Sequence, residues 1–253
     1  MPLVAITSVK GGAGKTMLAA NLAVGLRSVG WRVLAVDFNP QDALKLHFGL
    51  DPFDGRGFAA QMLSGASWED SVYGAAEGVD VMPFGRVPAA LSGSIAGMLA
   101  SDTDRVVANL SELASGRMVV VDAPCLTAPG ARRLAAAANV VIVMTPTDAG
   151  SFAALSLADA DAFFAGEGIM GRTLIVANQF DQANRLQRSV HALLTRAFGG
   201  KFAITIDRDE MVDEALAMRR TVLLHDHSSK AARSLVALAI QVDRLCAPNG
   251  ELH

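Results

Sequence analysis

The residues of this chain best suited to chemistry stand near the amino terminus, in the run Lys10-Gly11-Gly12-Ala13-Gly14-Lys15-Thr16. An apolar segment precedes this run, and a helical pattern follows it. Glycines permit a tight turn whose successive N–H groups point inward, and the positive end of the following helix dipole adds to their field. Lys15 can then reach the β- and γ-phosphates of a nucleotide, and the Thr16 hydroxyl can ligate Mg²⁺. The spacing predicts a phosphate-binding loop.

The longer run from Ser8 to Thr16 resembles the deviant phosphate loop of the MinD/ParA family of ATPases. In that family a lysine at the position of Lys10 reaches across a dimer to the partner's nucleotide. The resemblance implies ATP and Mg²⁺ as cofactors, a homodimer in the ATP state, and Lys10 and Lys15 as two cations that offset charge during γ-phosphoryl transfer. The family usually has threonine where this chain has Met17, which keeps its backbone N–H for the phosphates but lacks a hydroxyl.

A first carboxylate, Asp37, ends the apolar run of residues 33–36. The segment 33–41 resembles the family's switch I, usually written Asp-x-Asp-Pro-Gln, and Asp37 would hold a Mg²⁺-bound water. The family's second aspartate positions the attacking water, and Asn39 stands there in this chain. Asparagine can orient a water but cannot accept its proton. We therefore hypothesise slow hydrolysis, with Asp42 nearby as a carboxylate that could compensate.

A second carboxylate, Asp122, ends the run Met118-Val119-Val120-Val121. Taken alone, an aspartate here fits a helix cap as well as a metal site, because a helical pattern follows at 128–137. The segment 118–124 resembles the family's Walker B and switch II. With a phosphate loop on the same chain, we expect Asp122 to hold a Mg²⁺-bound water on the side of the metal opposite Asp37.

The base-binding residues are less sharply marked. Asn178 ends an apolar strand, and the resemblance implies that it contacts adenine, with Asp207 and Arg208 lying over the base. The alternative is guanine, because Asn178-Gln179-Phe180-Asp181 approximates the guanine-reading pattern Asn-Lys-x-Asp. We favour ATP over GTP on the phosphate loop. Asp209 also fits the N-cap of the next helix.

Apolar segments alternate with helical patterns along the whole chain. The expected strands cover residues 3–9, 32–37, 79–82, 117–122, 139–145, 173–178 and 202–206, and the expected helices cover 15–29, 102–114, 128–137, 149–164, 183–198, 209–218 and 229–246. Continuously apolar strands are buried on both faces, which predicts an α/β fold with a doubly wound, mostly parallel sheet flanked by helices. We expect one domain over residues 1–253, with the Gly-, Ser- and Pro-rich region 50–100 as an irregular connection.

Composition excludes several classes of protein. Of 253 residues, 51% are hydrophobic and 19% charged, which rules out a disordered chain. The longest apolar run, residues 235–240, is far too short to span a membrane. Two distant cysteines indicate a reducing cytoplasm, and a net charge of −3 disfavours broad nucleic-acid binding. The pair of histidines in His225-Asp226-His227 fits a turn before a helix better than a metal site.

Three further segments, residues 61–70, 81–85 and 206–211, are similar to the BcsQ branch, the MinD-like proteins of bacterial cellulose biosynthesis. The resemblance implies that cellulose synthase and secretion components are the partners. It also implies a cytoplasmic protein that such partners recruit to the inner face of the cell membrane.

Four other functions are consistent with part of the sequence. A MinD-type membrane cycler needs a basic amphipathic tail, but residues 246–253 contain no Lys or Arg, so we expect no direct membrane anchor. A ParA-type partition ATPase needs surface cations for DNA, such as Arg185, Arg188, Arg196 and Arg219-Arg220. An iron–sulfur or nickel carrier needs paired cysteines, and only Cys125 follows switch II. A nucleotide-locked scaffold without turnover is consistent with Asn39.

Overall fold

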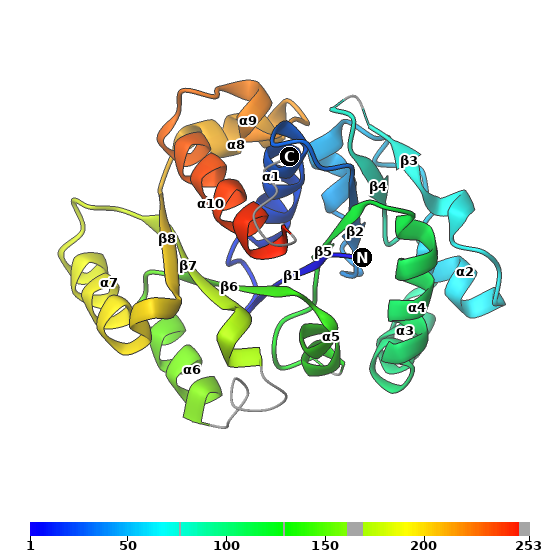
Figure 1. The fold of residues 1–253 in the computed structure, drawn as a ribbon, viewed down its shortest axis with the longest axis horizontal. Coiled ribbons are helices and arrows are strands. Elements are labelled where there is room, and N and C mark those ends of the chain that lie inside the picture. The colour runs from blue at the N-terminus through cyan, green and yellow to red at the C-terminus, as the bar shows by residue number, and fades with distance from the viewer. Residues whose placement is uncertain (76, 129, 161–168, 248–253) are drawn as a thin grey trace.

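A single mostly parallel sheet organises the computed structural model, which describes residues 1–75, 77–128, 130–160 and 169–247. The strand order in this described part is β3-β4-β2-β5-β1-β6-β7-β8, and only β3 runs antiparallel to its neighbour (Figure 1). The strands are β1 (Leu3–Ser8), β2 (Val33–Asp37), β3 (Tyr73–Gly74), β4 (Asp80–Met82), β5 (Met118–Asp122), β6 (Val140–Pro146), β7 (Thr173–Phe180) and β8 (Phe202–Asp207). The predicted α/β fold with a mostly parallel sheet is confirmed.

Helices cover both faces of this sheet. They are α1 (Lys15–Ser28), α2 (Phe58–Ser64), α3 (Ala89–Ser101), α4 (Thr103–Ala114), α5 (Ala131–Ala137), α6 (Ala149–Ala160), α7 (Arg185–Phe198), α8 (Glu210–Ala217), α9 (Val222–His225) and α10 (Lys230–Cys246). Short 3₁₀ turns are η1 (Leu44–Phe48), η2 (Glu69–Ser71), η3 (Ile169–Arg172) and η4 (Gly199–Lys201). Figure 1 shows α1 and α8–α10 on one side of the sheet, with α5–α7 on the other.

The strands other than β3 contribute side chains to two separate cores, one on each face. In β1, Val4 and Ile6 pack with α1 and α10, whereas Leu3 and Ala5 pack with the opposite layer. This alternation explains why the strands read as continuous apolar runs. Burial of both faces keeps the sheet rigid, and the residues at the carboxyl ends of the strands are therefore held at fixed positions.

The region 50–100 is not the irregular connection that the sequence predicted. It contains α2 and α3, and Phe58 of α2 packs against the rings of Phe38, Trp68 and Phe84 at centroid distances of 4.9–5.3 Å. The sequence did not predict helix α3, because its Ala, Gly and Ser residues give no apolar periodicity. Only Ile95 of α3 is buried. The aromatic cluster, rather than local helix propensity, organises this region.

The remaining differences lie at element ends. The helix expected at 128–137 begins only at Ala131, because Gly130 before it adopts a φ of 80°. Helix α9 was not predicted. The end of the helix expected at 149–164 and the carboxyl-terminal tail from residue 248 lie outside the described residues. Asp209 accepts a hydrogen bond from Met211 N–H and is the predicted N-cap of α8.

Strand register brings the chemistry to one edge of the sheet. Asp37 at the end of β2 pairs with Asp122 at the end of β5, and Ile6 of β1 also stands beside Asp122. Strand β1 lies between β5 and β6; the chain runs from β1 through α1 to β2 on one side of it, and from β5 through α5 to β6 on the other. Such a switch point is where open α/β sheets bind ligands.

Candidate nucleotide-binding site

The loop between β1 and α1 has the backbone that a phosphate cradle requires. Gly12 and Gly14 have φ values of 73° and 91°, a region that residues with a Cβ rarely adopt. A Cβ at Gly14 would also lie 2.4 Å from Asn178 Nδ2. The N–H groups of Lys15, Thr16 and Met17 open α1, so no intrahelical carbonyl can accept from them. These donors and the helix dipole favour an anion at this position.

The side chains of Lys15 and Thr16, directly after Gly14, point toward the end of β5. Thr16 Oγ1 donates a hydrogen bond of 2.5 Å to Asp122 Oδ2. Lys15 Nζ lies 3.2 Å from Ser8 Oγ and 3.6 Å from Cys125 Sγ. Sequence reasoning did not anticipate this contact between Lys15 and the thiol. Cys125 therefore lies against the phosphate loop.

The two predicted metal carboxylates are fully buried, at 0% exposure. Asp37 accepts hydrogen bonds from the N–H groups of Asn39 and Leu44. Asp122 Oδ1 is buried without a hydrogen-bond partner in the described part of the chain. Buried polar atoms normally have partners, and Mg²⁺ prefers oxygen ligands. The donor set of Thr16, Asp37 and Asp122 therefore fits a magnesium ion.

Burial shifts the acidity of this carboxylate pair. Desolvation raises the pKa of Asp37, and the nearby charge of Asp122 raises it further. Desolvation also raises the pKa of Asp122, partly offset by the hydrogen bond from Thr16 and the charge of Lys15. This pair therefore retains protons at a pH where exposed aspartates have lost them, and a divalent cation would compete with those protons.

These raised pKa values predict that binding of magnesium nucleotide strengthens with rising pH. The native state holds more protons than the unfolded state above the ordinary aspartate pKa of about 4, so the nucleotide-free protein loses stability as pH rises from there toward neutral. Mg²⁺ offsets this loss by replacing the protons. We expect the increase in Tm caused by Mg·ATP to be larger at about pH 8 than at about pH 5.5. Thermal melts of wild type and Asp122→Asn measure it; an identical pH dependence in the two proteins would contradict the assignment.

Asn39 links the two switch segments. Its Nδ2 donates a 3.0 Å hydrogen bond to the backbone carbonyl of Asp122, which an aspartate could not do. The contacts of Asp42 do not support the expectation that it compensates for Asn39. One Asp42 oxygen lies 2.5 Å from Lys45 Nζ in a buried ion pair, and the other accepts from Gly85 N–H. Asp42 therefore holds switch I against the loop after β4.

Lys10 makes an ion pair within its own chain. Its Nζ lies 2.9 Å and 3.1 Å from the carboxylate oxygens of Asp148, and the two side chains are 43% and 45% exposed. The backbone N–H and hydroxyl of Ser151 also donate to Asp148, at the start of α6. Sequence reasoning missed Asp148, although Asp-x-x-Ser after a strand is a recognisable cap. The reach of Lys10 to a partner's nucleotide stays a prediction.

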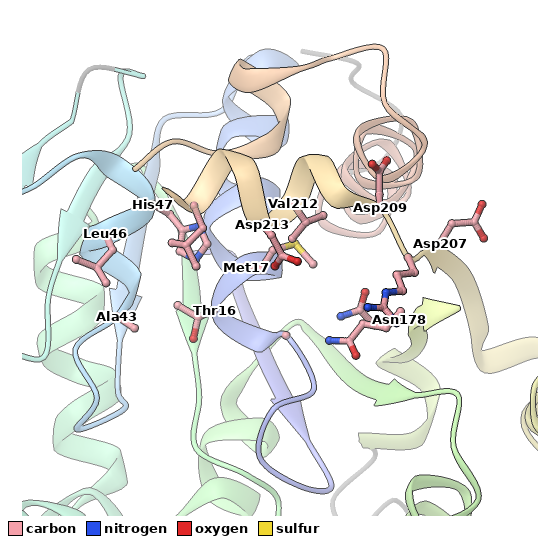
Figure 2. A pocket seen from close by; sticks show the side chains of 14 residues that line it. Thr16, Met17, Ala43, Leu46, His47, Asn178, Asp207, Asp209, Val212 and Asp213 are labelled. Carbon is pink, nitrogen blue, oxygen red and sulfur yellow. The ribbon is translucent and has the colours of Figure 1, made fainter. Parts of the chain in front are cut away.

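A cavity of about 450 Å³ extends from the start of α1 to the ends of β7 and β8 (Figure 2). Thr16, Met17, Asn178, Asp207 and Arg208 all line it, as the sequence predicted for a nucleotide site. Figure 2 shows Thr16 and Asn178 on opposite sides of Met17. The adenine contacts themselves stay predictions.

Asn178 has a structural task as well. It is 3% exposed, and its Nδ2 donates 2.8 Å to the Ala13 carbonyl, which anchors the phosphate loop to β7. Asp181, on which the guanine alternative depends, does not line the cavity. Its carboxylate accepts from Ala183 N–H in a local turn instead. The position of Asp181 therefore does not support the guanine alternative, and adenine stays the prediction.

Other chemical interpretations find little support among the described residues. No group of three or more His, Cys, Asp or Glu side chains within them is placed to hold a metal ion. His225 Nε2 lies 3.5 Å from Glu214, and Asp226 accepts from Ser228 within a turn. None of the helices in the described ranges combines the length and apolar character that a membrane span needs.

Comparison with known proteins identifies the family. The family model described as cellulose biosynthesis protein BcsQ matches residues 1–242. The chain belongs to the BcsQ family. The BcsQ protein of Salmonella typhimurium is 26% identical over 241 residues, which cover 94% of this chain and 93% of that protein. The predicted BcsQ branch is confirmed.

Further relatives place this BcsQ family member among the MinD/ParA-like ATPases. The chromosome-partitioning ATPase Soj of Thermus thermophilus is 30% identical over 245 residues, covering 94% of each chain. MinD, the cell division ATPase of Pyrococcus furiosus, matches with a TM-score of 0.77 at 23% identity over 96% of this chain and 99% of its own. MinD of Pyrococcus horikoshii, crystallised with Mg-ADP, also reaches 0.77, at 22% identity and 96% of each chain. The protein is a nucleotide-binding ATPase of this type.

Proposed function

We propose that this BcsQ-family protein is an ATP-dependent switch that closes into a two-fold dimer around two nucleotides. The observation that carries the proposal is the unpartnered Asp122 Oδ1, buried beside Thr16 and Asp37 at the mouth of a glycine-rich loop. Buried carboxylates of this kind are costly unless a cation joins them. Together with Lys15, they call for a ligand that brings Mg²⁺ and phosphate at once.

The magnesium ion would be held by the Thr16 hydroxyl and, through water, by Asp37 and Asp122. When bound, it supplies positive charge that neutralises the β- and γ-phosphates. Lys15 adds a second cation from the chain itself, and the N–H groups of Gly12 to Met17 orient the phosphates. The γ-phosphate would order switch I and switch II, and hydrolysis would release them.

Lys10 is suited to exchange partners during this cycle. Its ion pair with Asp148 is about half exposed, and exposed pairs contribute only about 0–1 kcal/mol. Leaving Asp148 therefore costs little compared with binding a partner's triphosphate in a water-poor interface. We propose that Asp148 holds Lys10 in the single chain and that dimerisation transfers Lys10 to the nucleotide of the second copy.

We propose that turnover is slow, because Asn39 cannot accept a proton and its amide is bound to the Asp122 carbonyl. A slow ATPase suits a switch whose ATP state must last long enough to recruit partners. The family name supports cellulose synthase and secretion components as those partners, reached from the cytoplasm at the inner face of the membrane. DNA partition is the competing function, favoured by the similarity to Soj.

The proposed switch predicts an ATP-dependent change in mass. Size-exclusion chromatography with light scattering should report the 26.4 kDa monomer without nucleotide and with ADP, and twice that mass with Mg·ATP. A mass that does not respond to nucleotide would overturn the proposal. Binding of the ATP form to duplex DNA at physiological salt would favour the partition alternative.

A further inference from the structure

A buried ion pair in switch I has no part in the function proposed so far. Asp42 and Lys45 follow the exposed Pro40 and Gln41, but their own side chains are only 9% and 4% exposed. Lys45 Nζ lies 2.5 Å from Asp42 Oδ2. Taking two such charges out of water is so costly that apolar residues in their place are often equally stable. Stability alone therefore does not account for this pair.

The Asp42–Lys45 pair fastens switch I to two neighbouring segments. Lys45 Nζ donates a 2.7 Å hydrogen bond to the backbone carbonyl of Asp54, which precedes α2. Asp42 Oδ1 accepts a 3.1 Å hydrogen bond from Gly85 N–H in the loop after β4. Each charged side chain thus has a second partner outside switch I, and the turn between them is held from both ends.

The two segments that hold this turn are fixed to each other. Arg86 N–H donates a 2.8 Å hydrogen bond to the Gly55 carbonyl. Gly57 and Gly85 pack backbone against backbone, since a Cβ at Gly85 would lie 2.6 Å from Gly57 Cα. Phe58, the next residue of the chain, is fully buried in the aromatic cluster. The Asp42–Lys45 pair is therefore anchored to the packed core and not to a free loop.

Leu44 connects the pair to a candidate metal carboxylate. It stands between the two charges, and its N–H donates a 3.0 Å hydrogen bond to Asp37 Oδ2. The other oxygen of Asp37 accepts from Asn39 N–H. A carboxylate oxygen has two lone pairs, so each oxygen of Asp37 can still accept from a water on a metal ion. The position of Leu44 N–H therefore sets the orientation in which Asp37 meets that water.

We infer that Asp42 and Lys45 are positioning residues, which fix Leu44 N–H and thereby orient Asp37 toward magnesium. The inference rests on the proposed Mg·ATP site and adds to it two residues that do not touch the ligand. Groups that orient metal ligands in this way typically change metal affinity by about 10- to 100-fold when they are replaced. Pro40 and Gln41 precede the anchored turn, so the γ-phosphate can still reorder them.

Titration of Mg²⁺ at a fixed concentration of ADP tests the inference without the ATP-dependent dimer. Lys45→Met alone would leave the Asp42 charge buried without a cation, which is strongly destabilising. The test therefore uses Asp42→Asn/Lys45→Met, which removes both charges and keeps a side-chain oxygen for Gly85 N–H. We expect the Mg²⁺ midpoint to rise by about 10-fold or more, while the affinity for ADP in EDTA stays that of wild type. Without nucleotide, the Leu44 amide should exchange its hydrogen faster than in wild type.

The control is Asp80→Asn, which breaks the ion pair with Arg117 at the start of β4, away from switch I. It should lower the Tm and keep the wild-type Mg²⁺ midpoint. A wild-type midpoint in the double variant, or equal weakening of ADP with and without Mg²⁺, would rule out the positioning role and leave the nucleotide site intact. If wild type binds ADP no more tightly with Mg²⁺ than without, the proposed magnesium site fails as well. Asp42→Asn alone provides the same test if the double variant does not fold.

Discussion

Replacing Lys10 with alanine should abolish the ATP-dependent dimer and slow ATP hydrolysis by about 100-fold or more, while the affinity of the monomer for ATP changes little. The reason is charge: a cation inserted from a second subunit acts on the γ-phosphate only inside the closed assembly, and donors of this kind contribute about 10²–10³ in rate. Within its own chain the Lys10 side chain forms an ion pair with Asp148 and does not turn back over the glycines of the phosphate loop. Light scattering and single-turnover hydrolysis measure the two effects.

Two variants make this result specific. Asp148→Asn removes the ion pair but keeps Lys10, so it should dimerise at equal or lower ATP concentration than wild type. Lys230→Ala removes an exposed lysine at the start of α10 and should behave as wild type. A Lys10→Ala protein that still dimerises with ATP would show that the lysine does not cross the interface.

Replacing Asn39 with aspartate should accelerate single-turnover hydrolysis by about 10-fold or more, because a carboxylate at this position can take the proton of the attacking water. The change also removes the hydrogen bond from Asn39 Nδ2 to the Asp122 carbonyl and thereby frees switch I from switch II. It adds negative charge near Asp37 and Asp122, so we expect lower stability without magnesium and recovery with Mg·ATP. Quenched-flow hydrolysis and thermal melts report the two consequences.

Two controls distinguish the effect of the added proton acceptor from the effect of losing the hydrogen bond to the Asp122 carbonyl. Asn39→Ala breaks the same hydrogen bond without adding a carboxylate and should not gain rate. Gln41→Glu adds a carboxylate at an exposed position of switch I and should leave the rate unchanged. If Asn39→Asp is no faster than wild type, Asn39 does not limit turnover. If wild type fails to hydrolyse ATP even in a single turnover, the protein is a nucleotide-locked scaffold.

The sequence alone predicted the positions of the glycine-rich loop and of the two candidate metal carboxylates, because these positions follow from local order. A glycine-rich turn after a buried strand and before a helix has little conformational choice. Asp37 and Asp122 end parallel strands, and parallel strands carry their carboxyl ends to the same edge of the sheet. The pairing of Asp37 with Asp122 in the register of β2 and β5 confirms that edge.

Only the tertiary structure decided what the polar side chains around this loop contact. Lys10 and Asp148 are 138 residues apart, Asn39 and the Asp122 carbonyl 83, and Asn178 and the Ala13 carbonyl 165. Asp42 contacts Lys45 and Gly85 only because η1 packs beside the loop after β4. His47 and Asp213 line one cavity only because η1 and α8 lie near each other. Hydrogen bonds and ion pairs act over about 3 Å, so residue type and spacing cannot reveal them until the sheet and its helices fix the distances.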